Sequence, residues 1–373
     1  MSYIDQLFSY KKIYDQSGSE HLFIEAMRES LQHHGTNTVF WKASLSKLTQ
    51  YKSVEDFYEI EPIPSDVFKR NEVLSVPMEH IVLHATSSGT SGQKSQIFLD
   101  QKTLDLGVKM IIKSMRYHGL FSLIPTNYII LGYEPGPNNA MGNTKVADGM
   151  RRFAPALHTK YAIRAIGNSY ETDIIGVLET LKKYEKMRLP VRLLGFPIYL
   201  SRLLEIMDEM GMPSLKLSKK SVVLTGGGWK QFAGSEIPKA ELRERVFTRL
   251  GIPKENIRDF YSAVEHSVAY PECENHHMHV PIWSRVVIRD VKTLKPLGYD
   301  QPGFLNFISP LVHSMPLSSV MMKDIAVLRE GKTCGCGIQT PYFEVLGRAG
   351  ITQGKTCAIT AAELIGGEGY ESV

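Results

Sequence analysis

The sequence predicts an α/β fold with a largely parallel sheet, a helical N-terminal segment and a smaller β-rich part. Three segments with different patterns along the 373 residues carry this prediction. Residues 1–80 show helical periodicity, and residues 81–282 alternate short apolar runs with helical windows. Residues 283–346 contain apolar runs without helices between them. Alternating strands and helices are typical of parallel sheets, because the crossover between parallel strands is usually a helix.

The elements follow in order. In the first part, helices are predicted at Tyr3–Tyr14, His21–Gln32 and Thr38–Leu48, followed by a turn-rich segment at Ile60–Pro64. In the middle part, the predicted strands are Tyr128–Leu131, Val191–Leu194 and Ser221–Leu224, and the predicted helices are Leu104–His118, Glu171–Met187, Tyr199–Met210 and Lys239–Leu250. In the last part, strands are predicted at Arg285–Arg289, Gly303–Ile308, Ser319–Leu328 and Tyr342–Leu346.

Composition narrows the class of protein. A hydrophobic content of 43% allows a large core. The net charge of +4 is spread along the chain, so a nucleic-acid partner is not predicted. We find neither a secretory leader nor an apolar window long enough for a membrane span, and we expect a cytoplasmic protein. Four cysteines are too few for a disulfide scaffold and favour metal or thiol chemistry.

A polar loop between two apolar runs is the strongest sign of a binding site. It reads Ser87-Ser88-Gly89-Thr90-Ser91-Gly92-Gln93-Lys94-Ser95. Glycines let backbone N–H groups approach a ligand, hydroxyls donate hydrogen bonds, and the lysine supplies positive charge. The loop therefore predicts a cradle for nucleotide phosphates, although it matches neither the Walker pattern nor the dinucleotide fingerprint. An ordinary polar hairpin loop is the alternative.

Two further segments predict contacts with the same nucleotide. The triplet Gly226-Gly227-Gly228 follows an apolar run, where a ligand beyond the end of a strand can approach the backbone; a plain tight turn is the alternative. Tyr261 precedes Glu265 by four residues. The ring can stack on a base and the carboxylate can hold Mg²⁺, which prefers oxygen ligands. A surface acid after a strand is the alternative for Glu265.

Two residues later in the chain fit a ribose. Asp324 is an acid in an otherwise apolar run, and Arg348 lies in the sequence Leu-Gly-Arg-Ala-Gly. A carboxylate accepts hydrogen bonds from the ribose hydroxyls, and a guanidinium donates to them or to phosphate. For either residue taken alone, an ion pair or a solvated strand end is the alternative.

Taken together, the segments described above resemble those of a known protein superfamily. The order SSGTSGQKS, LTGGGWK, YSAVE, KD and GR resembles the adenylate-forming ligase superfamily. Within it, IPSDVFK, HVPIW, KTLKPLG and GKTCAIT are most similar to the LuxE acyl-protein synthetase family, in the phenylacetate-CoA-ligase-like branch. The resemblance implies an adenylate-forming core over residues 1–346 and a shortened, mobile C-terminal segment over 347–373. It departs from the wider superfamily at Gln93, where proline is common, and at Ser262, where glycine is common.

The resemblance also implies roles and an activity. ATP and Mg²⁺ activate a carboxylic acid, expected to be a fatty acid, to an acyl-adenylate. The acyl group then passes to a cysteine and on to a partner such as an acyl reductase. The loop residues would hold phosphates, Gly227 and Gly228 would line the adenine and acyl site, and Tyr261 would stack on adenine. Glu265 would bind Mg²⁺, while Asp324 and Arg348 would hold the ribose.

Cys357 is the predicted acyl acceptor. It lies near the end of the chain, beside Lys355, whose charge favours the thiolate, and the resemblance indicates the same residue. Lys355 is also a candidate counterpart of the superfamily's catalytic lysine. A small buried side chain is the alternative for Cys357.

The other cysteines suggest a separate metal site. Cys273, Cys334 and Cys336 with His279 form a set suited to tetrahedral zinc, and we favour His279 over His276 and His277. Four protein ligands leave no open position, so such a zinc would be structural. Free thiols and a solvated histidine run are the alternative.

Two other functions stay open at this point. A shortened aryl- or acyl-CoA ligase would use CoA in place of a cysteine as acceptor. A noncatalytic, zinc-stabilised subunit would bind nucleotide or acyl groups without turnover.

Overall fold

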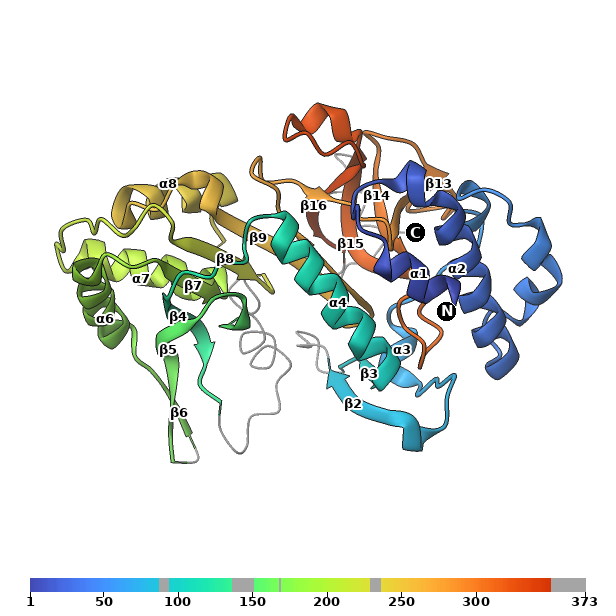
Figure 1. Ribbon diagram of the computed structural model, residues 1–373, viewed down its shortest axis with the longest axis horizontal. Coiled ribbons are helices and arrows are strands. Elements are labelled where there is room, and N and C mark those ends of the chain that lie inside the picture. The colour runs from blue at the N-terminus through green and yellow to red at the C-terminus, as the bar shows by residue number, and fades with distance from the viewer. Residues whose placement is uncertain (87–93, 136–150, 168, 229–235, 350–373) are drawn as a thin grey trace, which may run out of the picture. The chain divides into compact units, whose positions relative to one another are not determined.

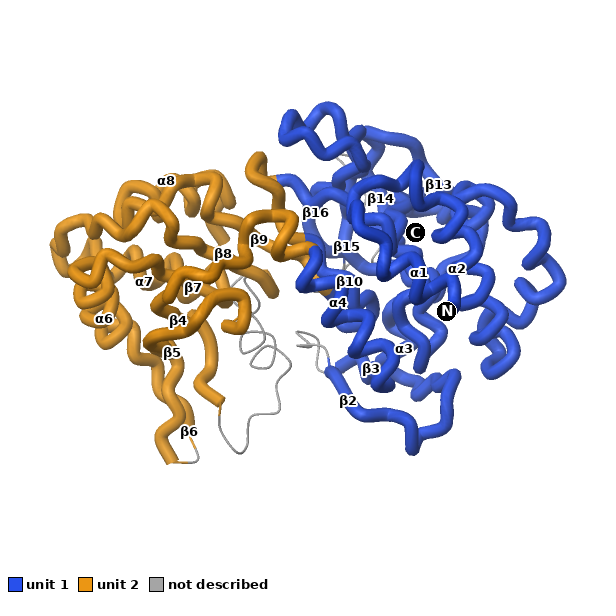
Figure 2. The backbone as a smooth tube through the Cα atoms, viewed as in Figure 1, with its two compact units in different colours: residues 1–113, 263–270, 277–373 blue, residues 114–262, 271–276 orange. Residues whose placement is uncertain are grey.

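The structure is a computed structural model that describes residues 1–86, 94–135, 151–167, 169–228 and 236–349 (Figure 1). The chain divides into two compact units (Figure 2). Unit 1 contains residues 1–113, 263–270 and 277–373, and unit 2 contains residues 114–262 and 271–276. Unit 2 is therefore largely one continuous insertion between two parts of unit 1.

Unit 2 is built around a mainly parallel sheet. Its strands, in the spatial order β9-β8-β7-β4-β5-β6, are β4 (Thr126–Tyr133), β5 (Ala156–Ile166), β6 (Ser169–Thr172), β7 (Val191–Gly195), β8 (Val222–Gly226) and β9 (Ile257–Ala263). Only the β5–β6 pair among these is antiparallel. The helices of this unit are α6 (Ile174–Met187), α7 (Pro197–Glu209) and α8 (Lys239–Leu250), with short 3-10 turns η4 (Arg151–Phe153) and η6 (Lys254–Asn256).

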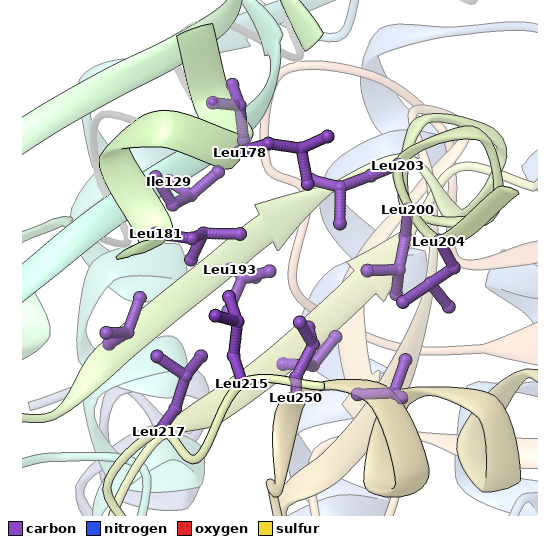
Figure 3. Packing of buried hydrophobic residues seen from close by; sticks show 14 of the residues in the cluster. Ile129, Leu178, Leu181, Leu193, Leu200, Leu203, Leu204, Leu215, Leu217 and Leu250 are labelled. Atoms are coloured by element: carbon purple, nitrogen blue, oxygen red, sulfur yellow. The ribbon is translucent and has the colours of Figure 1, made fainter. Parts of the chain in front are cut away.

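Leucine-rich faces of these helices cover the sheet (Figure 3). Leu181 of α6, Leu203 of α7 and Leu250 of α8 are fully buried with Leu193 of β7. Such burial removes apolar surface from water and is the main favourable term in folding. The packing holds the strands of the sheet in one rigid layer.

The register of the sheet aligns the ends of its central strands. Leu131 pairs with Gly195, Gly195 with Thr225, and Thr225 with Asp259. These four residues form a row across β4, β7, β8 and β9, at or next to the carboxyl ends of β7 and β8. The glycine triplet and Tyr261 follow this row on the same side, the triplet at the end of β8 and Tyr261 within β9.

Unit 1 combines N-terminal helices with a mainly antiparallel sheet. The helical elements are α1 (Tyr3–Ser9), α2 (Gln16–Asn37), α3 (Val67–Arg70) and the 3-10 helices η1 (Lys42–Gln50), η2 (Glu55–Phe57), η3 (Met78–His80) and η7 (Gly331–Cys334); α4 (Gln101–Tyr117) begins in this unit. The sheet has the order β11-β16-β15-β14-β12-β13. Its strands are β11 (Met278–His279), β12 (Arg285–Arg289), β13 (Pro296–Leu297), β14 (Pro302–Ile308), β15 (Ser319–Arg329) and β16 (Tyr342–Arg348), and β1 (Ile63–Pro64) adds to β15 in parallel.

Two further strand elements of unit 1 frame the predicted loop. Strands β2 (Ile81–Thr86) and β3 (Gln96–Asp100) form an antiparallel pair in which Thr86 lies opposite Gln96. The loop therefore begins and ends at neighbouring positions of one ladder. Strand β10 (His266–Pro271) follows the turn after β9.

The predicted α/β class is confirmed, with the sheets divided into a mainly parallel and a mainly antiparallel one. Some elements differ from the prediction. The first helix ends at Ser9, where Tyr10 adopts an extended conformation, and the segment predicted as a helix from Thr38 forms the 3-10 helix η1, preceded by Trp41 in the left-handed region at φ 62°. Strands β5 and β6 were not predicted, because the burial of β5 does not alternate regularly along the strand.

Within the described residues, none of the helices combines the length and apolar character needed to cross a bilayer.

His34 of α2 makes the stability of the fold depend on pH. Its side chain is fully buried, with Nε2 3.1 Å from the carbonyl oxygen of Val312 and Nδ1 2.7 Å from the Ser75 hydroxyl. Nε2 therefore donates a proton and Nδ1 accepts one, as a neutral ring requires. Burial lowers the pKa of His34 from 6.5 to about 3.

The unfolded chain consequently binds a proton at His34 below about pH 6.5, whereas the folded chain does not. We expect this histidine to reduce the free energy of unfolding by up to about 1.4 kcal/mol for each pH unit as the pH falls from 6.5 towards 3. In urea unfolding between pH 7.5 and 4.5, His34→Gln should show a shallower loss than the unmodified protein. The exposed His80→Gln is the control and should keep the original slope. Equal slopes for all three proteins would contradict the assignment.

Candidate functional site

Glu265 carries a buried charge in unit 1. It lies in the turn between β9 and β10, and only 6% of it is exposed. Its Oε1 accepts a hydrogen bond of 2.5 Å from the Ser95 hydroxyl, whereas Oε2 has no partner in the part of the chain that the structure describes. A hydroxyl orients a carboxylate but does not neutralise it, and an uncompensated buried charge is costly. The side chain therefore suits a cation, and its hard oxygen suits Mg²⁺.

The end of the predicted phosphate loop lies beside this carboxylate. Lys94 directly precedes Ser95, and its side chain is exposed to solvent. The structure thus brings the lysine end of the loop and Glu265 together, although they are far apart in sequence. The other predicted phosphate ligands lie outside the described residues: Ser87, Ser88, Gly89, Thr90, Ser91 and Gly92.

Asp324 and Arg348 are brought together by the antiparallel pairing of β15 and β16. They are directly opposite each other in the register, so their side chains start from the same face of the sheet. Next to them, the backbone N–H of Ala349 donates to the carbonyl oxygen of Lys323 at 2.8 Å and holds the strand end in place. Asp324 is half-buried and Arg348 is exposed. An acceptor and a donor side by side match the two hydroxyls of a ribose.

The glycine triplet of unit 2 ends β8, and its three members are glycine for different reasons. A side chain at Gly226 would meet the ring of Phe260, since an added Cβ would lie 2.5 Å from Cε1. Gly227 and Gly228 have φ of 80° and 64°, values that favour glycine. At Gly228 an added Cβ would meet no atom of the described residues within 4 Å. Packing therefore explains Gly226, while Gly227 and Gly228 turn the backbone.

Tyr261 lies at the same edge of the parallel sheet. Gly226 pairs with Phe260, so Tyr261 of β9 lies one residue past the last pair, at the level where Gly227 follows the end of β8. The ring of Tyr261 is partly exposed. Within unit 2 the structure thus unites the predicted adenine-stacking residue with the predicted adenine- and acyl-lining glycines.

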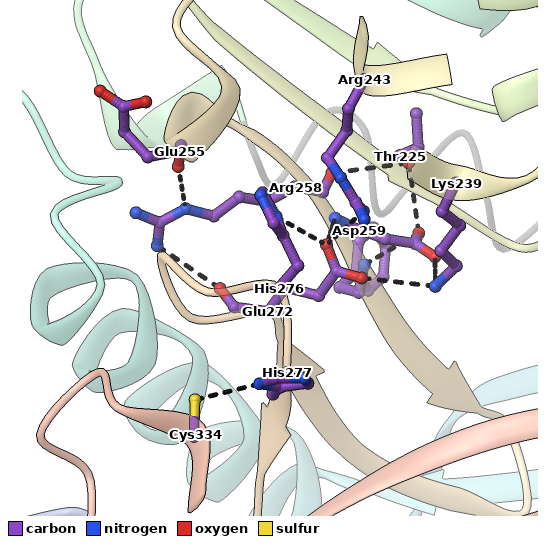
Figure 4. Close-up of polar contacts among 11 residues, drawn as sticks. Thr225, Lys239, Arg243, Glu255, Arg258, Asp259, Glu272, His276, His277 and Cys334 are labelled. Carbon is purple, nitrogen blue, oxygen red and sulfur yellow. Dashed lines mark hydrogen bonds and ion pairs between the residues drawn. The ribbon is translucent and has the colours of Figure 1, made fainter. Parts of the chain in front are cut away.

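A charged network, which sequence reasoning missed, holds β8 and β9 together just before this edge (Figure 4). Lys239 at the start of α8 lies 2.5 Å from Asp259 Oδ2 and 3.4 Å from Glu272 Oε1. Asp259 Oδ1 accepts from the Thr225 hydroxyl at 3.3 Å, and the Asp259 N–H donates to Glu272 Oε2 at 2.8 Å. Burial raises the pKa of Asp259, while Lys239 opposes that shift. The network therefore fixes the backbone of β8 and β9 just before Gly226 and Tyr261.

The predicted zinc ligands form a group. The candidate ligand atoms of Cys273, His279, Cys334 and Cys336 all lie within 4.8 Å of one another. Zinc with bonds of about 2.0–2.3 Å in tetrahedral geometry separates its ligand atoms by about 3.5–3.8 Å, so small adjustments suffice. None of these three cysteines forms a disulfide within the described residues. Four converging sulfur and nitrogen donors are the donor set that structural zinc prefers.

The ring of His279 is oriented for a metal. Its Nδ1 donates to the carbonyl oxygen of Thr340 at 2.8 Å, which leaves the lone pair on Nε2, 3.3 Å from Cys336 Sγ. Burial lowers the pKa of His279 to about 4, so the ring is neutral at pH 7. A carbonyl that fixes the far nitrogen is the usual support of a metal-binding histidine.

The two neighbouring histidines make other contacts. His277 stacks on Tyr342 with ring centroids 4.2 Å apart, and its Nδ1 lies 3.1 Å from Cys334 Sγ. His276 Nδ1 lies 3.7 Å from Glu272 Oε2. His279, and neither His276 nor His277, belongs to the group whose ligand atoms all lie within 4.8 Å of one another, although His277 also contacts Cys334.

The predicted acyl acceptor Cys357 and the neighbouring Lys355 lie outside the described residues. Ser95 is the residue of the site whose role the sequence did not reveal. It belongs to the loop motif, but its hydroxyl acquires a role only through a partner 170 residues away.

Solved structures share this fold. An open conformation of 2-hydroxyisobutyryl-CoA ligase in complex with 2-HIB-AMP and CoA matches with a TM-score of 0.64 at 12% identity, covering 91% of this chain and 71% of that chain. The same ligase in its postadenylation state, in complex with 2-HIB-AMP, also matches with a TM-score of 0.64, at 13% identity and over 95% and 74% of the two chains. At these identities the likeness establishes the fold, which is that of adenylate-forming ligases.

Two relatives are similar over most of their length. A long-chain-fatty-acid–luciferin-component ligase from Vibrio harveyi is 24% identical over 338 residues, which cover 90% of this chain and 86% of the relative. A protein of the same name from Aliivibrio fischeri is 25% identical over 312 residues, covering 82% and 79%. The model of the family "Acyl-protein synthetase, LuxE" matches residues 7–365. The chain therefore belongs to the LuxE acyl-protein synthetase family of ATP-dependent acyl ligases.

Proposed function

We propose that this chain activates a fatty acid with ATP to an acyl-adenylate, releases pyrophosphate, and transfers the acyl group through Cys357 to a partner protein. The names of the two relatives support a long-chain fatty acid as the substrate. The resemblance to the family supports a protein acceptor, such as an acyl reductase. The observation that carries the adenylation step is the buried carboxylate of Glu265 beside the end of the loop that contains Lys94.

The first step needs no protein nucleophile. The substrate carboxylate attacks the α-phosphorus of ATP, an O–P bond forms, and the bond to pyrophosphate breaks. Mg²⁺ bound at Glu265 would neutralise phosphate charge. Lys94 supplies a second positive charge, Asp324 and Arg348 hold the ribose, and Tyr261 stacks on the base. Catalysis then comes mainly from alignment and electrostatic stabilisation of the reacting groups.

Glu265→Gln tests the adenylation site. The amide keeps the shape of the side chain and can still accept from Ser95, but it has no charge for the metal. We expect acid-dependent ATP–pyrophosphate exchange to fall by about 100-fold or more, comparable to the loss of one strong electrostatic contact. The assay uses a panel of aliphatic and aromatic acids, with and without CoA. The exposed Glu241→Gln is the control and should retain full exchange. Full exchange in Glu265→Gln would remove this residue from the mechanism.

Cys357→Ser tests the second step. The thiolate would attack the carbonyl carbon of the acyl-adenylate, forming a thioester and releasing AMP. A serine hydroxyl is a much weaker nucleophile at neutral pH, so we expect pyrophosphate exchange within about twofold of the unmodified protein but no hydroxylamine-labile acyl-enzyme. A labelled fatty acid followed by denaturing electrophoresis measures the acyl-enzyme. An acyl-enzyme that persists in Cys357→Ser would exclude this acceptor, and CoA-dependent turnover in the same variant would favour a CoA ligase.

We also propose that Cys273, His279, Cys334 and Cys336 hold one structural zinc. Elemental analysis of the purified protein should give close to one zinc per chain. Cys336→Ser should lower this content and the thermal midpoint together, because the metal would stabilise the folded state by binding it. Cys357→Ser is the matched control, since it also removes one thiol but should keep the zinc. Well under one zinc per chain in the unmodified protein would instead indicate free thiols.

A further inference from the structure

We propose that Ser95 is a positioning residue, whose hydroxyl fixes the magnesium-binding carboxylate of Glu265 and couples it to the end of the phosphate loop. This inference rests on the proposed adenylation function. It adds to that function a residue that contacts neither the ion nor the substrate in the proposed mechanism.

The Ser95–Glu265 hydrogen bond is buried at both ends. Ser95 is 0% exposed and Glu265 is 6% exposed, and their oxygen atoms are 2.5 Å apart. Hydrogen bonds to a charged acceptor are shorter and stronger than neutral ones, and they gain strength away from water. This contact therefore restricts the Glu265 side chain far more than an exposed contact would.

Ser95 is attached to a rigid element on the loop side. It immediately precedes β3, whose first residue Gln96 pairs with Thr86 of β2. The side chain of Ser314 strengthens the same strand, because its hydroxyl donates to the carbonyl oxygen of Phe98 at 2.6 Å. The Ser95 hydroxyl is consequently held at one place relative to the end of the loop.

Glu265 is attached to an equally rigid element. The next residue, His266, is buried and stacks on Phe307 with ring centroids 4.1 Å apart and planes 4° apart. Its Nε2 lies 2.6 Å from the Tyr270 hydroxyl, which donates to the Ser284 hydroxyl at 2.8 Å. With both backbones fixed, the hydrogen bond sets the direction of the carboxylate.

The two carboxylate oxygens of Glu265 then have different roles. Oε1 accepts from Ser95, and Oε2 has no protein partner within the described residues. Magnesium needs near-ideal octahedral geometry and usually takes only one or two carboxylates besides phosphates and water. Without the Ser95 hydroxyl, the Glu265 carboxylate could rotate, and the proposed magnesium ligand would no longer be held in place. The proposed contacts of the protein to the base and the ribose would not change.

The test measures ion binding separately from nucleotide binding. Binding of Mn²⁺ in the presence of α,β-methylene-ATP is followed by the electron paramagnetic resonance signal of free Mn²⁺. Affinity for the same analogue in EDTA is measured by calorimetry. Ser95→Ala should weaken Mn²⁺ binding by about tenfold, as expected for a lost hydrogen bond to a charged group, with analogue affinity in EDTA unchanged within about twofold.

Two variants separate positioning from a general loss of stability. Ser314→Ala is the matched control, because it removes another fully buried serine hydroxyl that is bonded to β3 but does not contact Glu265. It should lower the thermal midpoint yet keep Mn²⁺ affinity. Ser95→Thr keeps the hydroxyl and should retain Mn²⁺ binding within about threefold, although its extra methyl group lowers stability.

A double-mutant cycle links the effect to Glu265. If Ser95 acts through that carboxylate, Ser95→Ala should change Mn²⁺ affinity by less than about twofold when Glu265→Gln is already present. Unchanged Mn²⁺ affinity in Ser95→Ala, or an equal loss of analogue affinity with and without the ion, would overturn the inference alone. Normal Mn²⁺ binding in Glu265→Gln would overturn the metal assignment of the proposed function as well.

Discussion

The buried negative charge of Glu265 is the constraint on which the site in unit 1 depends. A carboxylate at 6% exposure loses most of its hydration, and the Ser95 hydroxyl supplies a hydrogen bond but no opposite charge. A cation would compensate such a charge. Lys94, at the end of the loop, directly precedes Ser95, so in the proposed site the carboxylate, a magnesium ion and the phosphates would form a series of alternating charge.

The predicted ligand contacts in unit 2 are uncharged: they are the ring of Tyr261 and the backbone at Gly228. The parallel register brings the ends of β8 and β9 to one edge, and the helices packed on the sheet keep that edge rigid. Lys239 lies between Asp259 and Glu272, which hold the strands just before the edge. The ring of Tyr261 and the backbone at Gly228 can hold a ligand in a fixed position only when β9 and β8 are rigid.

The cysteine group would stabilise the fold without taking part in the reaction. Four protein donors fill a tetrahedral zinc, so no position remains for a substrate. The backbone carbonyl of Thr340 already sets the orientation of His279. Because Nδ1 of His279 already makes this hydrogen bond, the ring needs little reorientation when Nε2 binds a metal.

By itself, the sequence determined the alternation of strands and helices, the loop that ends at Lys94, the glycine triplet and the set of possible zinc ligands. These features depend on residues that are neighbours in the chain, where periodicity, backbone freedom and side-chain chemistry act locally. The tertiary structure decided that Ser95 would meet Glu265, that Asp259 would bridge β8 to Lys239, and that His279 would join all three cysteines in one group of candidate ligands. Such partners are chosen by packing between segments distant in sequence, and no local pattern records which buried groups will lie within hydrogen-bonding distance of one another.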